Sequence, residues 1–339
     1  MPAPVETAAQ ERPAAVPPRS PHPDWLRPGP VGGGLTNRLI YSGRIRASRW
    51  ARAHLSWLSR IRARLTVRDL FGTPGDTLLT GTVCRHVKQR WPGLRINCAT
   101  ANPDLLLCDP NVSELNGQPG LFVLDFWYLE LIERRDNTRH VLAPTLSSIG
   151  VDTTDYGARV YLTEAERGRA REFLEPMPRP RIAFNQRSAQ PAKNWPRRHW
   201  DALLPGLRAR GSLVQLGDQS EPVHEDVTRY AGRLTRRESM AILAECDIFV
   251  GPESFLMHAA SGLNVPAVVI FGGRTSPVVS GYAINRNLYT DLPCSGCWLS
   301  GHPGSECPHD LACLEAISVT DVLNAVDDEL QTARTRRSG

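Results

Sequence analysis

An aspartate follows a turn rich in glycine and proline in the first third of the chain. The turn runs from Gly72 to Gly75 and lies between an expected strand at 65–70 and an expected helix at 77–90, with Asp76 at the start of that helix. An aspartate in this place is a favoured N-cap, because its side chain accepts backbone N–H bonds. A carboxylate beyond the carboxyl end of a strand can also serve as a general base that takes a proton from an attacking hydroxyl. The sequence leaves both roles open for Asp76.

A second group of polar residues lies in the second half of the chain. Ser254 caps an expected helix at 254–262, which follows an expected strand at 247–250. Helix N-termini bind diphosphate well, because they offer free N–H groups and a partial positive charge. Lys193, on a loop beyond an expected strand at 181–185, can neutralise phosphate charge, although most lysines are simply solvated. His258 lies one turn after Ser254 on the same helix face, and we expect a structural or donor-orienting role for it.

Four cysteines are closely spaced near the carboxyl end. Cys294 and Cys297 form a C-x2-C pair, Cys307 follows after nine residues, and Cys313 follows after five more. Four thiolates at such spacing suit a tetrahedral structural site for Zn or Fe. Free thiols are the alternative.

The elements that would position these residues alternate between strands and helices. Expected strands lie at 65–70, 94–99, 121–126, 181–185, 213–216, 247–250 and 267–271, and expected helices at 77–90, 129–149, 164–174, 197–210, 236–244, 254–262 and 319–330. This alternation predicts an α/β protein with parallel sheets and right-handed crossovers. Pro176, Pro178 and Pro180 form a stiff connector. We therefore expect two Rossmann-like domains, at 65–175 and 181–333, that face a cleft and are preceded by a disordered proline-rich tail at 1–34.

A basic segment at 35–64 separates the tail from the first domain. Residues 38–64 carry eight arginines and no acid, and apolar residues such as Trp50, Trp57 and Leu58 recur at helical spacing. An amphipathic helix of this kind packs on the protein body or attaches to an anionic membrane surface or a partner. The net charge of +5 is too small to indicate a nucleic-acid binder. No apolar run reaches the ~18–20 residues that span a bilayer, and we expect a cytoplasmic protein.

The order of the motifs resembles glycosyltransferase family 9, the bacterial heptosyltransferases. The matching residues are Gly75-Asp76-Thr77-Leu78-Leu79-Thr80, Asp109-Pro110-Asn111-Val112, Lys193, Trp195, Pro196, Gly251, Ser254, His258, Ala260, Gly262 and Pro266. Two positions depart from the family pattern. Glu253 stands where the family has Asp, and Phe255 stands where it has Gly.

The resemblance implies a GT-B type glycosyltransferase fold and inverting transfer of a sugar from an ADP-heptose-like donor. The acceptor would be a glycan, a protein or a small molecule. Asp76 would be the catalytic base, and the donor would bind to Lys193, Gly217, Glu253, Ser254, Phe255 and His258. The first domain would bind the acceptor, and the second, with its cysteine-rich loop at 294–313, the donor. Catalysis would need no cofactor. Assembly into a homo-oligomer is compatible with the resemblance. The alternative is an inactive sugar-nucleotide-binding or adaptor protein of the same fold. A transferase of this kind requires Asp76 and Ser254 to open onto the same cleft.

Overall fold

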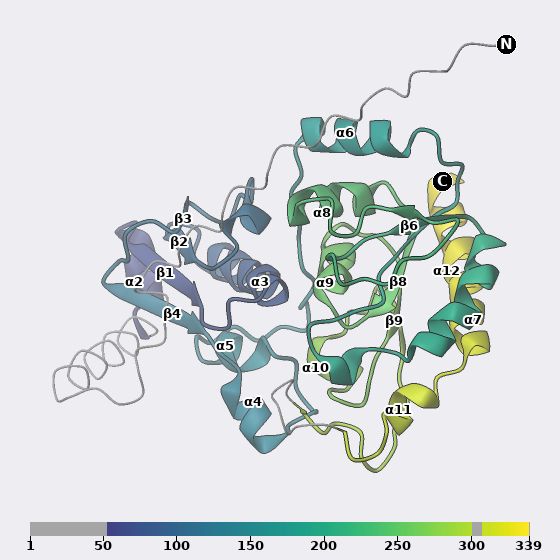
Figure 1. Ribbon diagram of the computed structural model, residues 1–339. Helices are drawn as coiled ribbons and strands as arrows, with labels where there is room; N and C mark the ends of the chain where they lie inside the picture. Colours follow the sequence, from purple (N-terminus) through teal and green to yellow (C-terminus); the bar gives the residue numbers. More distant parts are fainter. Residues whose placement is uncertain (1–52, 300–306, 339) are drawn as a thin grey trace, which may run out of the picture.

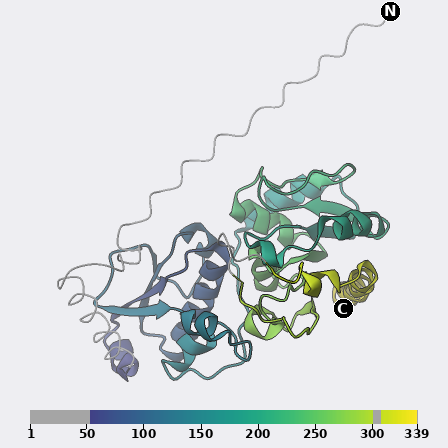
Figure 2. The same ribbon diagram turned by 60° about the horizontal axis from the view of Figure 1, so that its bottom comes forward.

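The computed structural model describes residues 53–299 and 307–338, and these form two bodies side by side, each with its own parallel sheet (Figures 1 and 2). The first sheet has the order β3-β2-β1-β4 and the second has the order β10-β9-β8-β5-β6-β7. Every strand pair in both sheets is parallel. This arrangement confirms two Rossmann-like α/β domains.

The first sheet is built around β1, an interior strand in which four of six residues are buried. Its strands are β1 (Arg64–Asp69), β2 (Arg95–Ala99), β3 (Glu114–Leu115) and β4 (Phe122–Phe126). Leu65 and Val67 of β1 are buried, and they pair in register with Ile96 and Cys98 of β2. Strands of a parallel sheet that is covered on both faces are nearly continuous runs of apolar residues. The carboxyl end of β1 then leads directly into the loop that carries Asp76.

Helices of the first domain surround that sheet. They are α2 (Leu55–Arg60), α3 (Pro74–Arg90), the short 3₁₀ helix η2 (Pro103–Leu106), α4 (Leu129–Arg134) and α5 (Ala143–Ser147). Every residue of α3 from Gly75 to Val87 is buried, because one side of the helix packs on β1 and β2 and another contacts α9 of the second domain. A helix buried on all sides lies in the interior of a protein.

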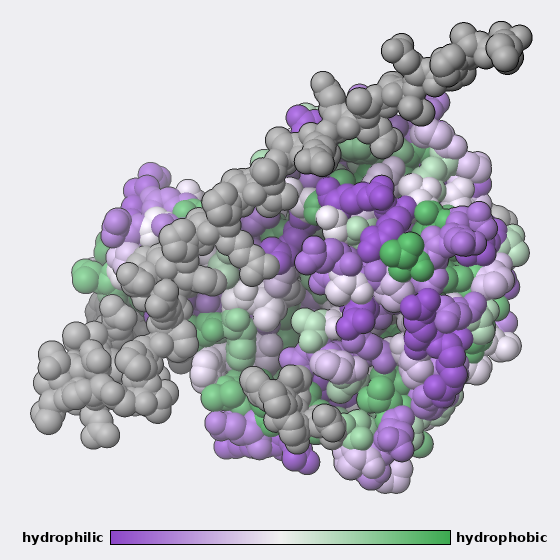
Figure 3. Space-filling view, viewed as in Figure 1, coloured by the Kyte–Doolittle hydropathy of each residue, from purple (hydrophilic) through white to green (hydrophobic). Residues whose placement is uncertain are grey.

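The second sheet consists of β5 (Arg181–Phe184), β6 (Ser212–Gln215), β7 (Thr228–Arg229), β8 (Ile248–Pro252), β9 (Ala267–Ile270) and β10 (Asn285–Leu288). Its larger helices are α6 (Glu164–Leu174), α7 (Arg197–Arg208), α8 (Arg236–Ala244), α9 (Phe255–Gly262) and α12 (Val319–Ser338), with η3 (Pro191–Lys193), α10 (Pro277–Ser280) and α11 (Ala312–Glu315) as short turns. The helices α7 and α12 pack together, α12 also covers β8, β9 and β10, and α8 packs on α9. Hydrophilic side chains dominate the outer face of this domain in the view of Figure 3.

Three elements differ from the sequence expectation. The helix expected at 129–149 is split, because Arg135 adopts a left-handed backbone (φ 51°) that ends α4. Of the basic segment, the described part forms one helix, α2, in which Leu55 and Leu58 are buried and Trp57 is 50% exposed. Ile61, which follows α2, is 54% exposed. The tail at 1–34 and most of the basic segment lie outside the described residues. The helix α6 packs on α8, so the chain reaches the second domain before the three prolines.

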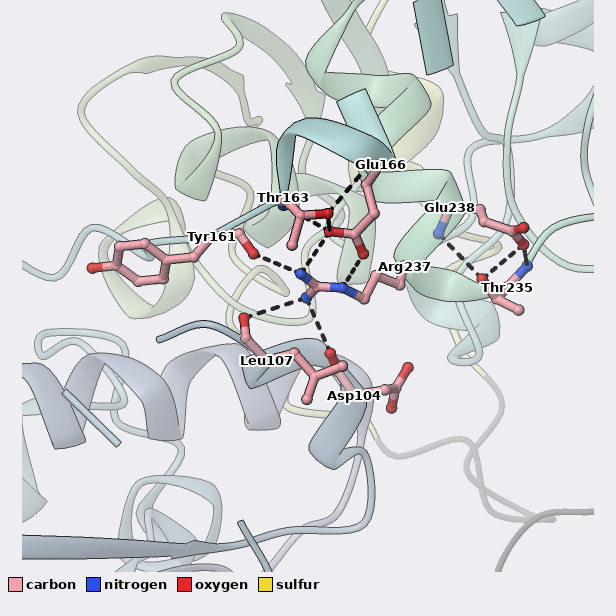
Figure 4. Close-up of polar contacts among 8 residues, drawn as sticks. All are labelled: Asp104, Leu107, Tyr161, Thr163, Glu166, Thr235, Arg237 and Glu238. Carbon is pink, nitrogen blue, oxygen red and sulfur yellow. Dashed lines mark hydrogen bonds and ion pairs between the residues drawn. The ribbon is translucent and has the colours of Figure 1, made fainter. Parts of the chain in front are cut away.

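A buried arginine of α8 connects the two domains (Figure 4). The guanidinium of Arg237 donates to the carbonyl oxygens of Asp104, in the first domain, and Tyr161, in the connector, over 3.1 and 2.7 Å. It also pairs with the carboxylate of Glu166 at the start of α6. In the part of the chain that the structure describes, no helix is both long and apolar enough to cross a membrane.

Candidate active site

Asp76 lies in the first turn of α3 and is not its N-cap, which corrects one of the two roles left open by the sequence. Thr73 caps the helix, and its Oγ1 accepts the N–H of Asp76 over 3.2 Å. Pro74 at the first helical position suits this arrangement, because it has no N–H to satisfy. The side chain of Asp76 is thereby free for other partners, although the residue is only 6% exposed.

Two hydroxyl groups hold the carboxylate of Asp76. Thr73 Oγ1 donates to Oδ2 over 2.5 Å, and the Tyr128 hydroxyl donates to Oδ1 over 2.8 Å. Burial raises the pKa of Asp76 to about 6, and the nearby carboxylate of Asp69 adds to the rise, whereas the two hydroxyl donors and the charge of Lys193 oppose it. A carboxylate with a pKa near the working pH takes and releases a proton most effectively.

Asp69, the last residue of β1, fixes the turn that leads to Asp76. Its carboxylate accepts the N–H groups of Phe71 and Gly72 over 3.1 and 2.8 Å, and the hydroxyls of Thr77 and Thr100 over 3.0 and 2.9 Å. A buried carboxylate with four donors is fully satisfied. The position of the loop from Phe71 to Asp76 therefore depends on the strand end.

Three aromatic rings line the same edge of the first sheet. Phe71 stacks on Tyr128 with ring centroids 4.1 Å apart and on Trp127 at 5.7 Å. Phe71 follows β1, while Trp127 and Tyr128 follow its neighbour β4. Trp127 is 43% exposed. Because the Tyr128 hydroxyl touches Asp76, the aromatic group and the carboxylate form one surface.

Lys193 and Glu253 form a buried ion pair in the second domain. Lys193 Nζ lies 3.1 Å from Glu253 Oε1. Glu253 also accepts the hydroxyls of Thr275 and Ser280 over 3.0 and 2.6 Å. Although burial acts to raise it, the pKa of Glu253 falls to about 2, because Lys193, Ser280 and Arg274 stabilise the charged form. Burial lowers the pKa of Lys193 and the charge of Glu253 opposes that fall. Glu253 thus holds the ammonium of Lys193 in place.

Arg274 is a cation of this site that the sequence analysis missed. Its Nε donates to the carbonyl oxygen of Leu299 over 2.7 Å, and its guanidinium lies over the ring of Trp298 at 5.5 Å. Its charge acts on Lys193, Glu253 and Tyr128. The signal in the sequence was an arginine directly after two glycines at the carboxyl end of β9, the place where such sheets bind ligands.

The helix α9 begins next to this ion pair. Ser254 is its N-cap residue but makes no capping hydrogen bond with its side chain, and its Oγ lies 3.4 Å from Asn185 Oδ1. Phe255 is half-buried against the hydrophobic core. His258 is buried, and its Nδ1 lies 2.6 Å from the Tyr282 hydroxyl. Burial lowers the pKa of His258 to about 4, so the imidazole is neutral near pH 7.

The two halves of the site meet where α3 contacts α9. A Cβ atom on Gly75 would lie 3.0 Å from His258 Cδ2 and 3.2 Å from its Nε2. The charge of Lys193 is also close enough to lower the pKa of Asp76. The start of α3, with Asp76, therefore lies against the first turn of α9, which contains His258.

Gly217 lies after β6 in a loop that bends back towards β5. Its φ of +118° is a conformation that side chains rarely adopt, and a Cβ there would lie 2.7 Å from Glu221 Cγ. The Glu221 carboxylate accepts the N–H groups of Gln186 and Arg187 over 2.9 and 3.1 Å. Burial raises the pKa of Glu221 to about 7. The loops after β5 and β6 are therefore joined through one carboxylate.

The four clustered cysteines do not gather into a metal centre. Among residues 53–299 and 307–338, no three side chains of His, Cys, Asp or Glu are placed to hold a metal ion. Cys313 is buried, and its Sγ accepts the N–H of Gly273 over 3.0 Å. Burial raises the pKa of the Cys313 thiol, and the thiols of Cys294 and Cys307 add to this rise.

Comparison with known proteins finds a family that matches part of the chain. The model described as glycosyltransferase family 9 (heptosyltransferase) matches residues 136–295. The matched residues are similar to those of the family 9 heptosyltransferases. The matched range contains Lys193, Glu253 and α9, and the first sheet with Asp76 precedes it.

Characterised heptosyltransferases are similar to parts of the chain. Lipooligosaccharide heptosyltransferase 2 of Haemophilus influenzae is 32% identical over 101 residues, 26% of this chain and 29% of the relative. Lipopolysaccharide heptosyltransferase 1 of Pseudomonas aeruginosa is 27% identical over 183 residues, 50% of this chain and 48% of the relative. The chain thus matches less than half the length of these relatives.

The fold of the chain is that of GT-B heptosyltransferases. The iron-containing dodecameric glycosyltransferase TibC from enterotoxigenic E. coli H10407 superimposes with a TM-score of 0.63 at 17% identity, over 80% of this chain and 77% of TibC. TibC has also been solved in complex with ADP-D-β-D-heptose. At this level of identity the similarity concerns the fold alone.

Proposed function

We propose that the protein is an inverting heptosyltransferase that uses an ADP-heptose donor. The observation that carries the proposal is the placement of a buried carboxylate with a raised pKa, Asp76, near the ammonium of Lys193, which is paired with Glu253 beside the start of α9. ADP-heptose is the donor named in the TibC complex, and the family 9 domain covers the donor side of the site.

The proposed chemistry is a single displacement at the anomeric carbon of the donor. The acceptor oxygen attacks this carbon as Asp76 takes its proton, and the bond to the diphosphate oxygen breaks with its electrons leaving on ADP. Lys193, Arg274 and the free N–H groups at the start of α9 would stabilise the departing diphosphate. Glu253 and His258 would position the lysine and the donor without transferring protons. No step requires a metal ion.

The acceptor would lie on the aromatic surface beside Asp76. Trp127, with Phe71 behind it, presents a flat apolar face next to the proposed base, which suits the apolar face of a sugar ring. This favours a glycan over a protein side chain as acceptor. Mass spectrometry of reactions with a panel of acceptors would identify the acceptor. The panel contains lipopolysaccharide core oligosaccharides and serine-containing peptides.

The decisive experiment measures ADP release from ADP-heptose by the purified chain and by Asp76→Asn. We expect turnover to fall at least ~100-fold, since the general base is lost, while ADP affinity measured by calorimetry stays unchanged. Asp125→Asn is the matched control, because Asp125 pairs with Arg68 over 2.7 Å in the same sheet. Unchanged turnover in Asp76→Asn would remove Asp76 from the mechanism. Donor binding without ADP release by the wild type would favour the inactive binding protein.

Location and assembly are further parts of the proposal. We propose a cytoplasmic protein, in which the neighbouring buried thiols of Cys84 and Cys98 would stay reduced. The exposed Trp57 and Ile61 beside Arg60 could contact an anionic membrane surface, which vesicle co-sedimentation with and without residues 1–64 would test. A homo-oligomer, as in dodecameric TibC, would be detected by light scattering.

A further inference from the structure

Two adjacent arginines of α8 reach from the second domain into the first. Arg237 is buried, and its Nη1 donates to the carbonyl oxygens of Asp104 and Leu107 over 3.1 and 3.5 Å. These carbonyls lie in and just after η2, which packs on α3. Figure 4 shows the guanidinium between this turn and the start of α6. One side chain of the donor domain therefore bonds the segment that supports the helix of Asp76.

The guanidinium of Arg237 is held from the other side by a carboxylate. Nη2 lies 3.0 Å from Glu166 Oε2, and Nε pairs with Oε1. Glu166 also accepts the N–H and hydroxyl of Thr163 over 2.8 Å each, as part of a capping box at the start of α6. A planar guanidinium that satisfies a carboxylate and several carbonyls at once has a fixed orientation. The fixed guanidinium of Arg237 therefore holds η2 in its position against the second domain.

The neighbouring Arg236 contacts the segment from Gly72 to Thr77, called here the base loop because it contains Asp76, through one intervening residue, Asn102. Its Nη1 lies 3.3 Å from Asn102 Oδ1. Asn102 is buried, and its Nδ2 donates to the carbonyl oxygen of Gly72 over 3.0 Å and to Thr77 Oγ1 over 3.1 Å. Gly72 and Thr77 flank the loop that contains Thr73 and Asp76. The contact of α8 with Asn102 therefore fixes both ends of the loop that carries the proposed base.

We infer that Arg236 and Arg237 are positioning residues, which set the base loop of the first domain against the diphosphate site of the second. This inference rests on the proposed function. The donor contacts proposed above, Lys193, Arg274 and the start of α9, all lie in the second domain and do not depend on this link. Loss of the link should therefore leave donor affinity intact and slow the chemical step, because a displacement of ~1 Å costs on the order of 100-fold in rate.

The test compares Arg237→Met, Arg237→Lys and Arg236→Gln with the wild type in the full chain. Arg210→Met is the matched control, because Arg210 makes an equally bidentate pair with Asp327 over 2.6 and 2.7 Å, within the second domain. ADP affinity is measured by calorimetry, and ADP release from ADP-heptose gives the turnover, with water as acceptor when none is added. Circular dichroism melts show that each variant is folded.

We expect turnover to fall at least ~10-fold in Arg237→Met and less in Arg236→Gln, with ADP affinity within ~2-fold of the wild type. Arg237→Lys should resemble Arg237→Met, since an ammonium cannot satisfy the carboxylate and the carbonyls together. A fall no larger than that of Arg210→Met would overturn the inference, as would an equal loss of ADP affinity. A wild type that releases no ADP would instead refute the proposed function.

Discussion

At the scale of single residues, the hydrogen bond from Tyr128 is one of the contacts that lower the pKa of Asp76 against the effect of burial. Removing it in Tyr128→Phe takes away a donor that favours the charged carboxylate, so the pKa of Asp76 should rise above its present value of about 6. Because the base works only when ionised, the acid limb of the turnover profile should move to higher pH. The check is ADP release measured from pH 5 to 9.

Tyr230→Phe provides the comparison for this profile. Its hydroxyl donates to the carbonyl oxygen of Phe173 over 3.0 Å in the second domain, remote from the site. The acid limb of the turnover profile of Tyr230→Phe should coincide with that of the wild type. A Tyr128→Phe profile that also coincided would show that the tyrosine does not tune the base.

Some of these residues follow from the sequence and others do not. Asp76, Lys193 and Ser254 could be singled out, because each follows a strand in a turn with its own local pattern. Tyr128 and Arg274 reach the site from the ends of other strands, and local spacing carries no information on which strand ends are neighbours. The sequence suggested Asp76 as an N-cap, whereas in the structure Thr73 is the N-cap and accepts the N–H group of Asp76.

At the scale of elements, the contact between α3 and α9 leaves no room for a side chain at Gly75. In Gly75→Ala the new methyl group would approach His258 Cδ2 to 3.0 Å, so the start of α3 or the imidazole must move. We expect turnover to fall, on the order of 10-fold, with little change in the melting temperature, because alanine also favours the helix.

Gly168→Ala in α6 is the matched substitution. Its new Cβ would meet nothing within 4 Å, so the variant should gain about 0.5–1 kcal/mol in the free energy of unfolding and keep its turnover. Denaturant unfolding and ADP release separate the two effects. Equal turnover in both variants would show that the helices tolerate a wider spacing.

The ion pair between η3 and the end of β8 has a second consequence, for stability. In Glu253→Gln the buried ammonium of Lys193 loses its partner, and such a loss costs about 3–5 kcal/mol. Glu315→Gln, which weakens half-exposed pairs with Arg198 and His199, should cost less than about 1 kcal/mol. Urea unfolding at pH 7 measures both. Similar values would mean that the Lys193 pair is solvated.

The same pair has a defined dependence on pH. Because the pKa of Glu253 is lowered to about 2 from 4.5, its stabilising contribution is complete above pH 4.5 and is lost as the pH falls towards 2.

The helices and strands were largely predictable from the sequence, since apolar runs and turns mark their ends. The helix expected at 129–149 was too long, because the apolar spacing continues through Arg135, where the backbone changes hand.

At the scale of the whole molecule, metal binding by the four clustered cysteines stays a prediction. Elemental analysis of the purified chain should find on the order of one Zn or Fe per chain if the thiolates bind a metal, and Cys297→Ser should lose it. Cys108→Ser, at an exposed cysteine of the first domain, should retain it. Metal-free wild-type protein would leave the cysteines as free thiols.

The relation between the domains was the part of the structure that the sequence did not contain. Two sheets and a facing arrangement follow from the alternating pattern and the resemblance. The side chains that join them, such as Arg237, look like ordinary surface arginines of an amphipathic helix in the sequence. Their partners are backbone carbonyls, which any residue offers, so no pairing of residue types announces the contact.

Finally, the segment from Cys313 to Ile317 supports the loops that carry Lys193 and Arg274, the two cations of the proposed diphosphate site. The indole N–H of Trp195, two residues after Lys193, bonds the carbonyl oxygens of Leu314 and Ile317 over 3.0 and 3.2 Å. Cys313, just before them, bonds the N–H of Gly273, the neighbour of Arg274. Oxidising or alkylating this thiol would therefore loosen two loops of the proposed diphosphate site at once, and we expect the affinity for ADP to fall.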